Sequence, residues 1–278
     1  MEEEAANMHR IICSTGALLG MPNGRNFYLV RECVDKLRCD AYEFMMYDTW
    51  YPRAEELAGF LASLPIEIPY WHCEKRIGEQ FSLRREGDWE DALQKFELNC
   101  QLAVFLGAKR MVLHLWDGPV SDQHFENNLE IFPLLLKIAQ KHGVTLLVEN
   151  VVCNSGDPLT HWQTLRDKYP DVRFVFDTKM AAFHGQMEQA YAPSFRPYWE
   201  NHIRHLHIND YGGGYMDWQN LKTLHVGKGS VDFDRFFSFL KTLPYSGDFT
   251  VEATSFVPDG VIRCDDLNRT FDYIREHM

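Results

Sequence analysis

The chain has 278 residues, 45% of them hydrophobic and 14% aromatic, with a formal net charge of −12 and a pI of about 5.4. So much apolar material is enough for a sizeable core and excludes an intrinsically disordered chain. The acidic balance, without any local run of Lys and Arg, weighs against a nucleic acid as partner.

The first residues, MEEEAANMHR, are acidic and contain no apolar stretch, so we expect no signal peptide. Residues 1–8 precede the first predicted strand and are expected to form a flexible extension. Seven cysteines, an odd number without a CxxC pair, indicate reduced thiols rather than a disulfide framework. No apolar run is long enough to span a bilayer. We therefore expect a cytoplasmic protein that does not interact with membranes.

Short apolar segments alternate with helical patterns along the rest of the chain. The predicted strands cover residues 10–14, 41–46, 66–72, 110–115, 144–150, 172–176, 203–208 and 248–252. Helical periodicity predicts helices over 88–106 and over 121–141, the second with Ser121 as N-cap and Gly143 at its end. A third helix is predicted to begin at Asp232.

Eight strand–helix units in a chain of this length predict a single-domain α/β protein, a (β/α)₈ TIM barrel over residues 9–278. The alternative is an open, doubly wound sheet. That fold usually has a GxGxxG turn after its first strand, and here the turn reads STGALLGMPNG, without that spacing. The barrel is therefore the favoured prediction.

Four candidate metal ligands end successive predicted strands at the same point: Glu149, Asp177, His207 and Glu252. In a barrel these strand ends meet at one face, and strand alternation turns the four side chains inward. Three carboxylates and one imidazole suit a divalent cation, and without a cation the buried carboxylates would repel one another. The alternative, that each acid caps a helix or pairs with an arginine, explains one residue more easily than four at matching places.

The segments around these residues, LLVEN, FVFDTK, IRHLHIND and FTVEA, and the later VGKGSVDF resemble the xylose isomerase-like TIM-barrel superfamily. This superfamily includes sugar isomerases and epimerases, inosose dehydratases and endonuclease IV. The resemblance implies that Glu149, Asp177, His207 and Glu252 bind one divalent metal ion. Mn²⁺ is the favoured ion, with Mg²⁺, Co²⁺ or Zn²⁺ as alternatives. It also implies that the two glutamates flank the substrate as acid and base.

Two further histidines, His72 and His114, end predicted strands and have two interpretations. Histidines at similar places help endonuclease IV-like members to hold a further zinc ion, so a second metal ion is one interpretation. We favour the other, in which both line the pocket and bind substrate hydroxyls. The rest of the endonuclease pattern is missing, because Met180 replaces an expected histidine and no Asp-x-His pair precedes VGKG.

The residues that would recognise the substrate depart from the ketose 3-epimerases. Those enzymes have a histidine at the position of Met180 and an arginine at the position of Gly213. Lys179 and His184 are the alternative substrate contacts, although both also fit exposed loop positions.

Two more residues are candidates for substrate binding. Glu43 is expected to point inward, where it would bind substrate, act as a second acid or base, or pair with a barrel arginine such as Arg110. Trp116 falls on a loop of the same face and would pack on the C–H face of a sugar or simply within the loop.

The predicted function is a metal-dependent isomerase or epimerase that acts on a sugar or sugar-like polyol ketone. It would transfer a proton next to a carbonyl through a metal-stabilised enediolate. Loss of a β-hydroxyl from the same enediolate would instead give an inosose or ketosugar dehydratase. Alternatives of other classes are an endonuclease IV-like phosphodiesterase and a non-catalytic, metal-stabilised barrel that binds a sugar. The expected partner is a small sugar or polyol, and the sequence leaves a homo-oligomer open.

Overall fold

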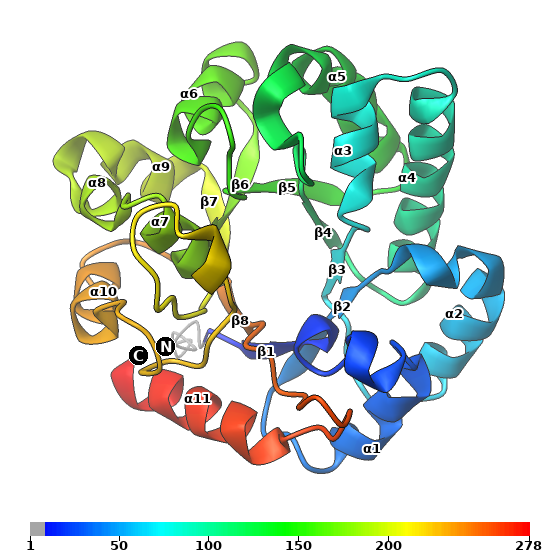
Figure 1. Cartoon of the computed structure of the whole chain (residues 1–278), viewed down its shortest axis with the longest axis vertical. Helices are drawn as coiled ribbons and strands as arrows, with labels where there is room; N and C mark the ends of the chain where they lie inside the picture. Colours follow the sequence, from blue (N-terminus) through cyan, green and yellow to red (C-terminus); the bar gives the residue numbers. More distant parts are fainter. Residues whose placement is uncertain (1–8) are drawn as a thin grey trace, which may run out of the picture.

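The fold is a closed barrel of eight parallel strands. The computed structural model describes residues 9–278, so the extension predicted at residues 1–8 lies outside the described residues. The strands follow one another around the barrel in chain order, and β8 pairs with β1 to close it. Helices surround the strands on the outside (Figure 1). The predicted (β/α)₈ barrel is confirmed.

The strands lie close to their predicted positions, with one exception. They are β1 (Ile11–Ser14), β2 (Ala41–Met45), β3 (Tyr70–His72), β4 (Arg110–Leu113), β5 (Thr145–Glu149), β6 (Arg173–Asp177), β7 (Ile203–His207) and β8 (Asp248–Val251). The exception is β3, which was predicted from residue 66 and begins only at Tyr70. Pro69 precedes it and has no N–H to donate to a neighbouring strand, which accounts for the late start.

The helices are α1 (Val30–Val34), α2 (Ala54–Ala62), α3 (Arg76–Leu83), α4 (Asp88–Phe105), α5 (Phe125–Lys141), α6 (Pro158–Lys168), α7 (Thr178–Phe183), α8 (Met187–Tyr191), α9 (Arg196–Asn201), α10 (Phe233–Leu240) and α11 (Cys264–His277). Among residues 9–278, none of these is long and apolar enough to cross a lipid bilayer.

Local signals explain where α10 begins and where α5 ends. The Asp232 side chain accepts a hydrogen bond from the Arg235 N–H at 2.9 Å and caps α10 as predicted. Gly143 follows α5 with a φ of +71°, a conformation that glycine adopts without strain. The prediction of Ser121 as N-cap was wrong. Residues 121–124 form a 3₁₀ turn, and the Ser121 hydroxyl donates to the Val152 carbonyl instead.

Apolar side chains fill both sides of the barrel wall. A large cluster packs between the strands and the surrounding helices. A smaller one occupies the barrel interior and takes one residue from each of the first six strands: Ile12, Ala41, Tyr70, Val112, Leu147 and Val175. The last two strands contribute the buried polar residues His205 and Thr250 instead. Polar groups therefore extend from the strand ends down into the barrel.

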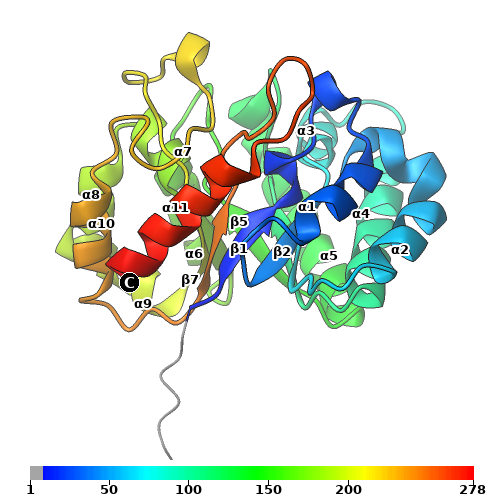
Figure 2. The ribbon, with the colours of Figure 1, turned by 90° about the horizontal axis from the view of Figure 1, so that it is seen from below.

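The loops that follow the strands gather at one end of the molecule. Figure 2 shows the segment after β7, in yellow, and the segment after β8, in orange-red, rising at the same end. In TIM-barrel proteins the active site lies at this C-terminal end of the strands.

Candidate functional site

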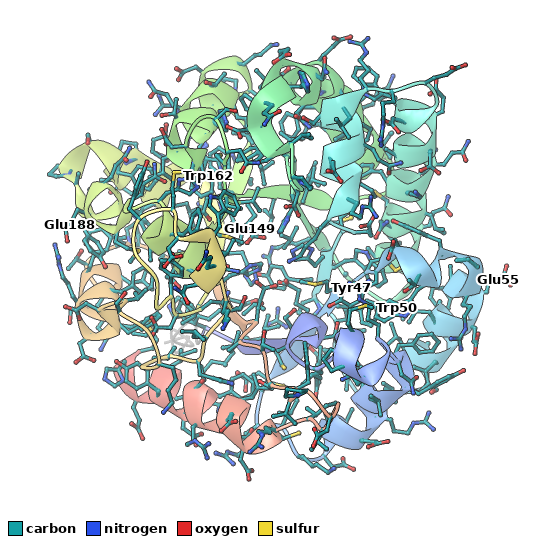
Figure 3. All side chains as sticks on the ribbon, viewed as in Figure 1. Tyr47, Trp50, Glu55, Glu149, Trp162 and Glu188 are labelled. Atoms are coloured by element: carbon teal, nitrogen blue, oxygen red, sulfur yellow. The ribbon has the colours of Figure 1, made fainter. Side chains whose placement is uncertain are left out.

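The four predicted ligands converge at the C-terminal end of the barrel. Glu149, Asp177 and His207 end β5, β6 and β7, and Glu252 follows β8. Each offers a ligand atom, and these atoms lie within 4.8 Å of one another. His207 Nδ1 lies 3.3 Å from Glu252 Oε2, 3.4 Å from Glu149 Oε1 and 3.9 Å from Asp177 Oδ2. Figure 3 shows Glu149 near the middle of the molecule, whereas Glu188 lies at its edge. We call these four residues the metal cage.

The metal cage has unsatisfied atoms of the kind that a cation would bind. His207 Nδ1, Glu149 Oε1 and Glu252 Oε1 are buried and have no hydrogen-bond partner among residues 9–278. A buried polar atom without a partner costs about 1–3 kcal/mol. Carboxylate oxygens with an imidazole nitrogen suit Mn²⁺, Mg²⁺ or Zn²⁺. The residues therefore fit one divalent cation.

A carboxylate inside the barrel orients the histidine of the cage. Glu43 Oε1 lies 3.2 Å from His207 Nε2, and Glu43 Oε2 accepts from Thr250 Oγ1 at 3.1 Å and lies 3.0 Å from His205 Nε2. Burial opposes ionisation of Glu43, but His207 and His205 outweigh it and lower the pKa of Glu43. An ionised Glu43 that accepts the Nε2–H of His207 leaves the Nδ1 lone pair free for a metal ion.

The structure thus places Glu43 inside the barrel, against two histidines. The predicted pairing of Glu43 with Arg110 is wrong, because Arg110 donates to the Tyr70 hydroxyl at 3.0 Å instead. A substrate role for Glu43 stays a prediction.

Two asparagines fix the carboxylates of the cage. Asn209 Nδ2 donates to Asp177 Oδ2 at 2.8 Å and to Glu252 Oε2 at 3.4 Å, and Asn209 Oδ1 accepts from the Glu252 N–H at 2.9 Å. Asn150 Oδ1 accepts from the Asp177 N–H at 2.6 Å. Sequence reasoning missed both, although each follows a predicted ligand by one or two residues. Their bonds limit the positions that the Asp177 and Glu252 side chains can adopt.

The charges of the cage are strongly coupled. Burial, with the negative charges of Glu149 and Glu252, raises the pKa of Asp177 to about 6. Burial opposes a charge on His207, but the surrounding glutamates outweigh it and raise its pKa well above the usual range. Protons thus compensate the carboxylates when no cation does, so cation binding is expected to release protons.

His72 and His114 lie beside the cage, as a second group around Glu149. His114 Nε2 lies 2.9 Å and His72 Nε2 3.5 Å from Glu149 Oε2. The Nδ1 of His72 faces the Cys73 carbonyl at 2.8 Å, and the Nδ1 of His114 faces Asp117 Oδ2 at 2.8 Å. His72, His114 and Glu149 offer ligand atoms within 4.8 Å of one another. This arrangement fits a second cation as well as substrate contacts, and both interpretations stay predictions.

Three other predicted substrate residues make no hydrogen bond or ion pair to the cage within residues 9–278. Lys179 Nζ donates to Thr223 Oγ1 at 3.0 Å, and His184 Nε2 accepts from the Cys153 N–H at 3.0 Å. Both side chains are buried, so the alternative of exposed loop residues was wrong for them. Trp116 is fully buried, and its indole N–H donates to the Val151 carbonyl at 3.2 Å. Their contact with substrate stays a prediction.

The structure also explains the glycine where an epimerase arginine was expected. A Cβ atom at Gly213 would lie 2.3 Å from the Tyr211 hydroxyl, which is far inside van der Waals contact. Tyr211 in turn donates that hydroxyl to the Gly214 carbonyl at 2.7 Å. A side chain at position 213 would therefore require the Tyr211 ring to shift and give up this hydrogen bond.

Comparisons with known proteins agree with this fold. A sequence profile described as "Xylose isomerase-like TIM barrel" matches residues 33–272. A search of curated protein sequences found no match.

Among solved structures, three similar ones have informative names. D-allulose 3-epimerase from Methylomonas sp., in complex with D-allulose, has a TM-score of 0.72 and 15% identity over 97% of each chain. The IOLI protein with a bound zinc atom has a TM-score of 0.71 and 14% identity over 97% of this chain and 99% of that one. The 3-keto-D-glucoside 4-epimerase YcjR from E. coli has a TM-score of 0.68 and 15% identity over 97% and 100%. At such low identity these similarities show a shared fold.

Proposed function

Because the chain belongs to the xylose isomerase-like TIM-barrel family, we propose that it is a divalent-metal-dependent isomerase or epimerase of a sugar or sugar-like polyol ketone. The proposal rests on one observation above all. Two glutamates, Glu149 and Glu252, reach the same histidine nitrogen from β5 and from the end of β8, and each keeps a buried oxygen that has no partner among residues 9–278. Sugar epimerases among the structures with this fold support the same conclusion.

Each residue of the site has a distinct part in the proposed reaction. A divalent cation held by the metal cage would supply Lewis acidity, which lowers the free energy of negative charge on a carbonyl oxygen. One of Glu149 and Glu252 removes a proton from the carbon next to that carbonyl. The other returns a proton to the opposite face. Asp177 and His207 serve as ligands only.

His114 would assist the proton transfer at Glu149. It lies between Glu149 Oε2 and Asp117 Oδ2, at 2.9 and 2.8 Å. Burial opposes a charge on His114, but Glu149 and Asp117 outweigh it and raise its pKa. A proton taken by Glu149 could therefore be shared with His114 until it is returned.

Solvent deuterium tests the proposal. The protein is incubated in D₂O with Mn²⁺ and a panel of ketopentoses, ketohexoses and inososes, and the products are analysed by NMR and mass spectrometry. We expect deuterium at one carbon next to the carbonyl, and only when the cation is present. Inverted configuration at that carbon identifies an epimerase, deuterium at the neighbouring carbon an isomerase, and loss of a hydroxyl group a dehydratase.

Two controls give the assay its negative outcomes. A protein that binds Mn²⁺ in a calorimetric titration but exchanges no proton in any substrate would be a metal-stabilised binder instead. Nicking of an abasic-site duplex would favour the phosphodiesterase. The buried group of His72, His114 and Glu149 makes that assay worthwhile, although the buried Met180 stands where the endonuclease pattern has a histidine.

A further inference from the structure

Lys75 brings a positive charge to the acidic end of the barrel. It lies three residues after the end of β3 and directly before α3, and its side chain is half-buried. Within residues 9–278 its ammonium group makes no hydrogen bond, and no carboxylate oxygen lies within 4.0 Å of it. Sequence reasoning did not single it out.

The acids around Lys75 come from three strand ends. Burial opposes its charge, but Glu252, Glu149 and Asp117 outweigh burial and raise the pKa of Lys75 to about 12. Conversely, burial opposes ionisation of Glu252, while His207 and in addition Lys75 lower its pKa to about 2. Lys75 follows β3 at the same end of the barrel as the metal cage, and its charge lies near enough to Glu252, Glu149 and Asp117 for these groups to act on one another.

Other lysines of this chain contrast with Lys75. Lys141 on α5 pairs with Glu97 at 2.8 Å, and Lys179 donates to Thr223 at 3.0 Å. The ammonium group of Lys75 has three donors, yet within residues 9–278 no carboxylate oxygen lies within 4.0 Å of it. Without an acceptor among these residues, it is available to donate to an oxygen atom of a molecule bound at this end of the barrel.

We propose that Lys75 contacts the substrate and donates a hydrogen bond to the oxygen that gains negative charge when the neighbouring carbon loses its proton. This inference rests on the function proposed above. In that step the C–H bond breaks, and the proton passes to a glutamate carboxylate. The electron pair forms a C=C bond, and the carbonyl π electrons move onto the oxygen. A preorganised donor at that oxygen stabilises the transition state more than the ground state.

Substitutions at Lys75 test this role. Lys75→Met keeps much of the length of the side chain and removes its charge and donors, whereas Lys75→Arg keeps the charge. With the substrate found by deuterium exchange and saturating Mn²⁺, we expect Lys75→Met to lower kcat by about 100- to 1,000-fold, with a much smaller change in KM. Lys75→Arg should recover part of kcat, and added propylamine should restore activity to Lys75→Ala. The matched control is Lys141→Met, which should keep full kcat.

The outcomes separate the two proposals. Calorimetric titration with Mn²⁺ shows whether each variant still binds the cation, and circular dichroism shows whether it folds. If the methionine variant does not fold, Lys75→Gln takes its place. A variant that binds Mn²⁺ and keeps kcat within threefold of the wild type would mean that Lys75 only balances the carboxylates. That overturns the inference and leaves the proposed function standing. A wild type that exchanges no proton overturns both.

Discussion

The two ends of the barrel differ in whether their buried polar groups have hydrogen-bond partners within the protein. At the N-terminal end, Arg10 pairs with Asp248 at 3.0 Å, the Tyr70 hydroxyl donates to Asp248 at 3.1 Å, and Arg110 donates to that hydroxyl at 3.0 Å. No side-chain atom of these four residues is among the buried atoms without a partner in residues 9–278. At the C-terminal end, by contrast, the metal cage leaves several such atoms. The four polar residues at the N-terminal end are satisfied by one another, whereas the polar atoms of the metal cage need a ligand to satisfy them.

The two ends meet in the middle of the barrel. Tyr70 stacks on His205 with their ring centres 3.8 Å apart, and His205 contacts Glu43, which supports His207 of the cage. We therefore expect changes at the C-terminal end to affect catalysis and metal binding, and changes at the N-terminal end to affect stability. A change at the C-terminal end that affected only stability would contradict this division. So would a change at the N-terminal end that affected catalysis or metal binding.

The largest effect is expected from Glu252→Gln. The amide has nearly the same shape but cannot accept the substrate proton, so kcat should fall by about 1,000-fold. The rate of deuterium exchange under saturating Mn²⁺ measures this, and thermal unfolding serves as the control for folding. Full turnover by this variant would remove Glu252 from the acid–base pair.

A smaller effect is expected from Glu43→Gln. The variant weakens the carboxylate contact that holds Nε2 of His207, so the affinity for Mn²⁺ should fall by about 10- to 100-fold. Calorimetric titration measures the affinity. The matched control is Glu188→Gln, on the outer surface, which should bind Mn²⁺ as the wild type does. Equal affinity in both variants would show that Glu43 does not orient the ligand.

The pH dependence of metal binding should reflect Asp177. Because its pKa is raised to about 6, the folded metal-free protein keeps a proton on this carboxylate below that pH. The cation must displace this proton as well as the one on His207, whose pKa is also raised, so the fall in affinity should steepen by up to about a further tenfold per pH unit as the pH drops below 6. Titrations in buffers of different ionisation enthalpy count the protons released. A constant affinity between pH 7 and pH 5 would contradict the raised pKa.

The smallest effect is expected from Tyr70→Phe at the N-terminal end. The ring that stacks on His205 is kept, and only the hydroxyl bonds to Asp248 and Arg110 are lost. Because Asp248 stays paired with Arg10, the free energy of unfolding should fall by only about 0.5–1.5 kcal/mol. Urea unfolding measures this loss. Metal affinity and kcat should be unchanged, and a large drop in either would mean that the two ends are coupled through His205.

Sequence reasoning predicted the barrel and the residues of the cage because both depend on local patterns. Apolar runs alternate with helical periods, and a polar residue ends or directly follows each of the last four strands. The partners of those residues depend on contacts that no local pattern reveals. Glu43 on β2 reaches His207 on β7, 164 positions later and across the barrel interior.

The other missed residues have the same explanation. Asn209 is recognisable only once Asp177 and Glu252 are known to lie on either side of it. Lys75 looks like an ordinary surface lysine until the acids of three other strand ends are placed around it. The error at Ser121 arose because its hydroxyl binds the distant Val152 carbonyl rather than its own helix.

The closure of the barrel has a consequence for folding kinetics. Glu252 directly follows β8, and β8 pairs with β1 across 238 positions, from Ile11 to Phe249. We expect contacts of such high sequence separation to form late, because closing a long loop costs conformational entropy before the contacts can stabilise it. We therefore expect the cage to gain its last ligand as the two ends of the chain come together. A cation bound there should slow unfolding and leave the rate of folding nearly unchanged, because it stabilises the barrel only after the barrel has closed.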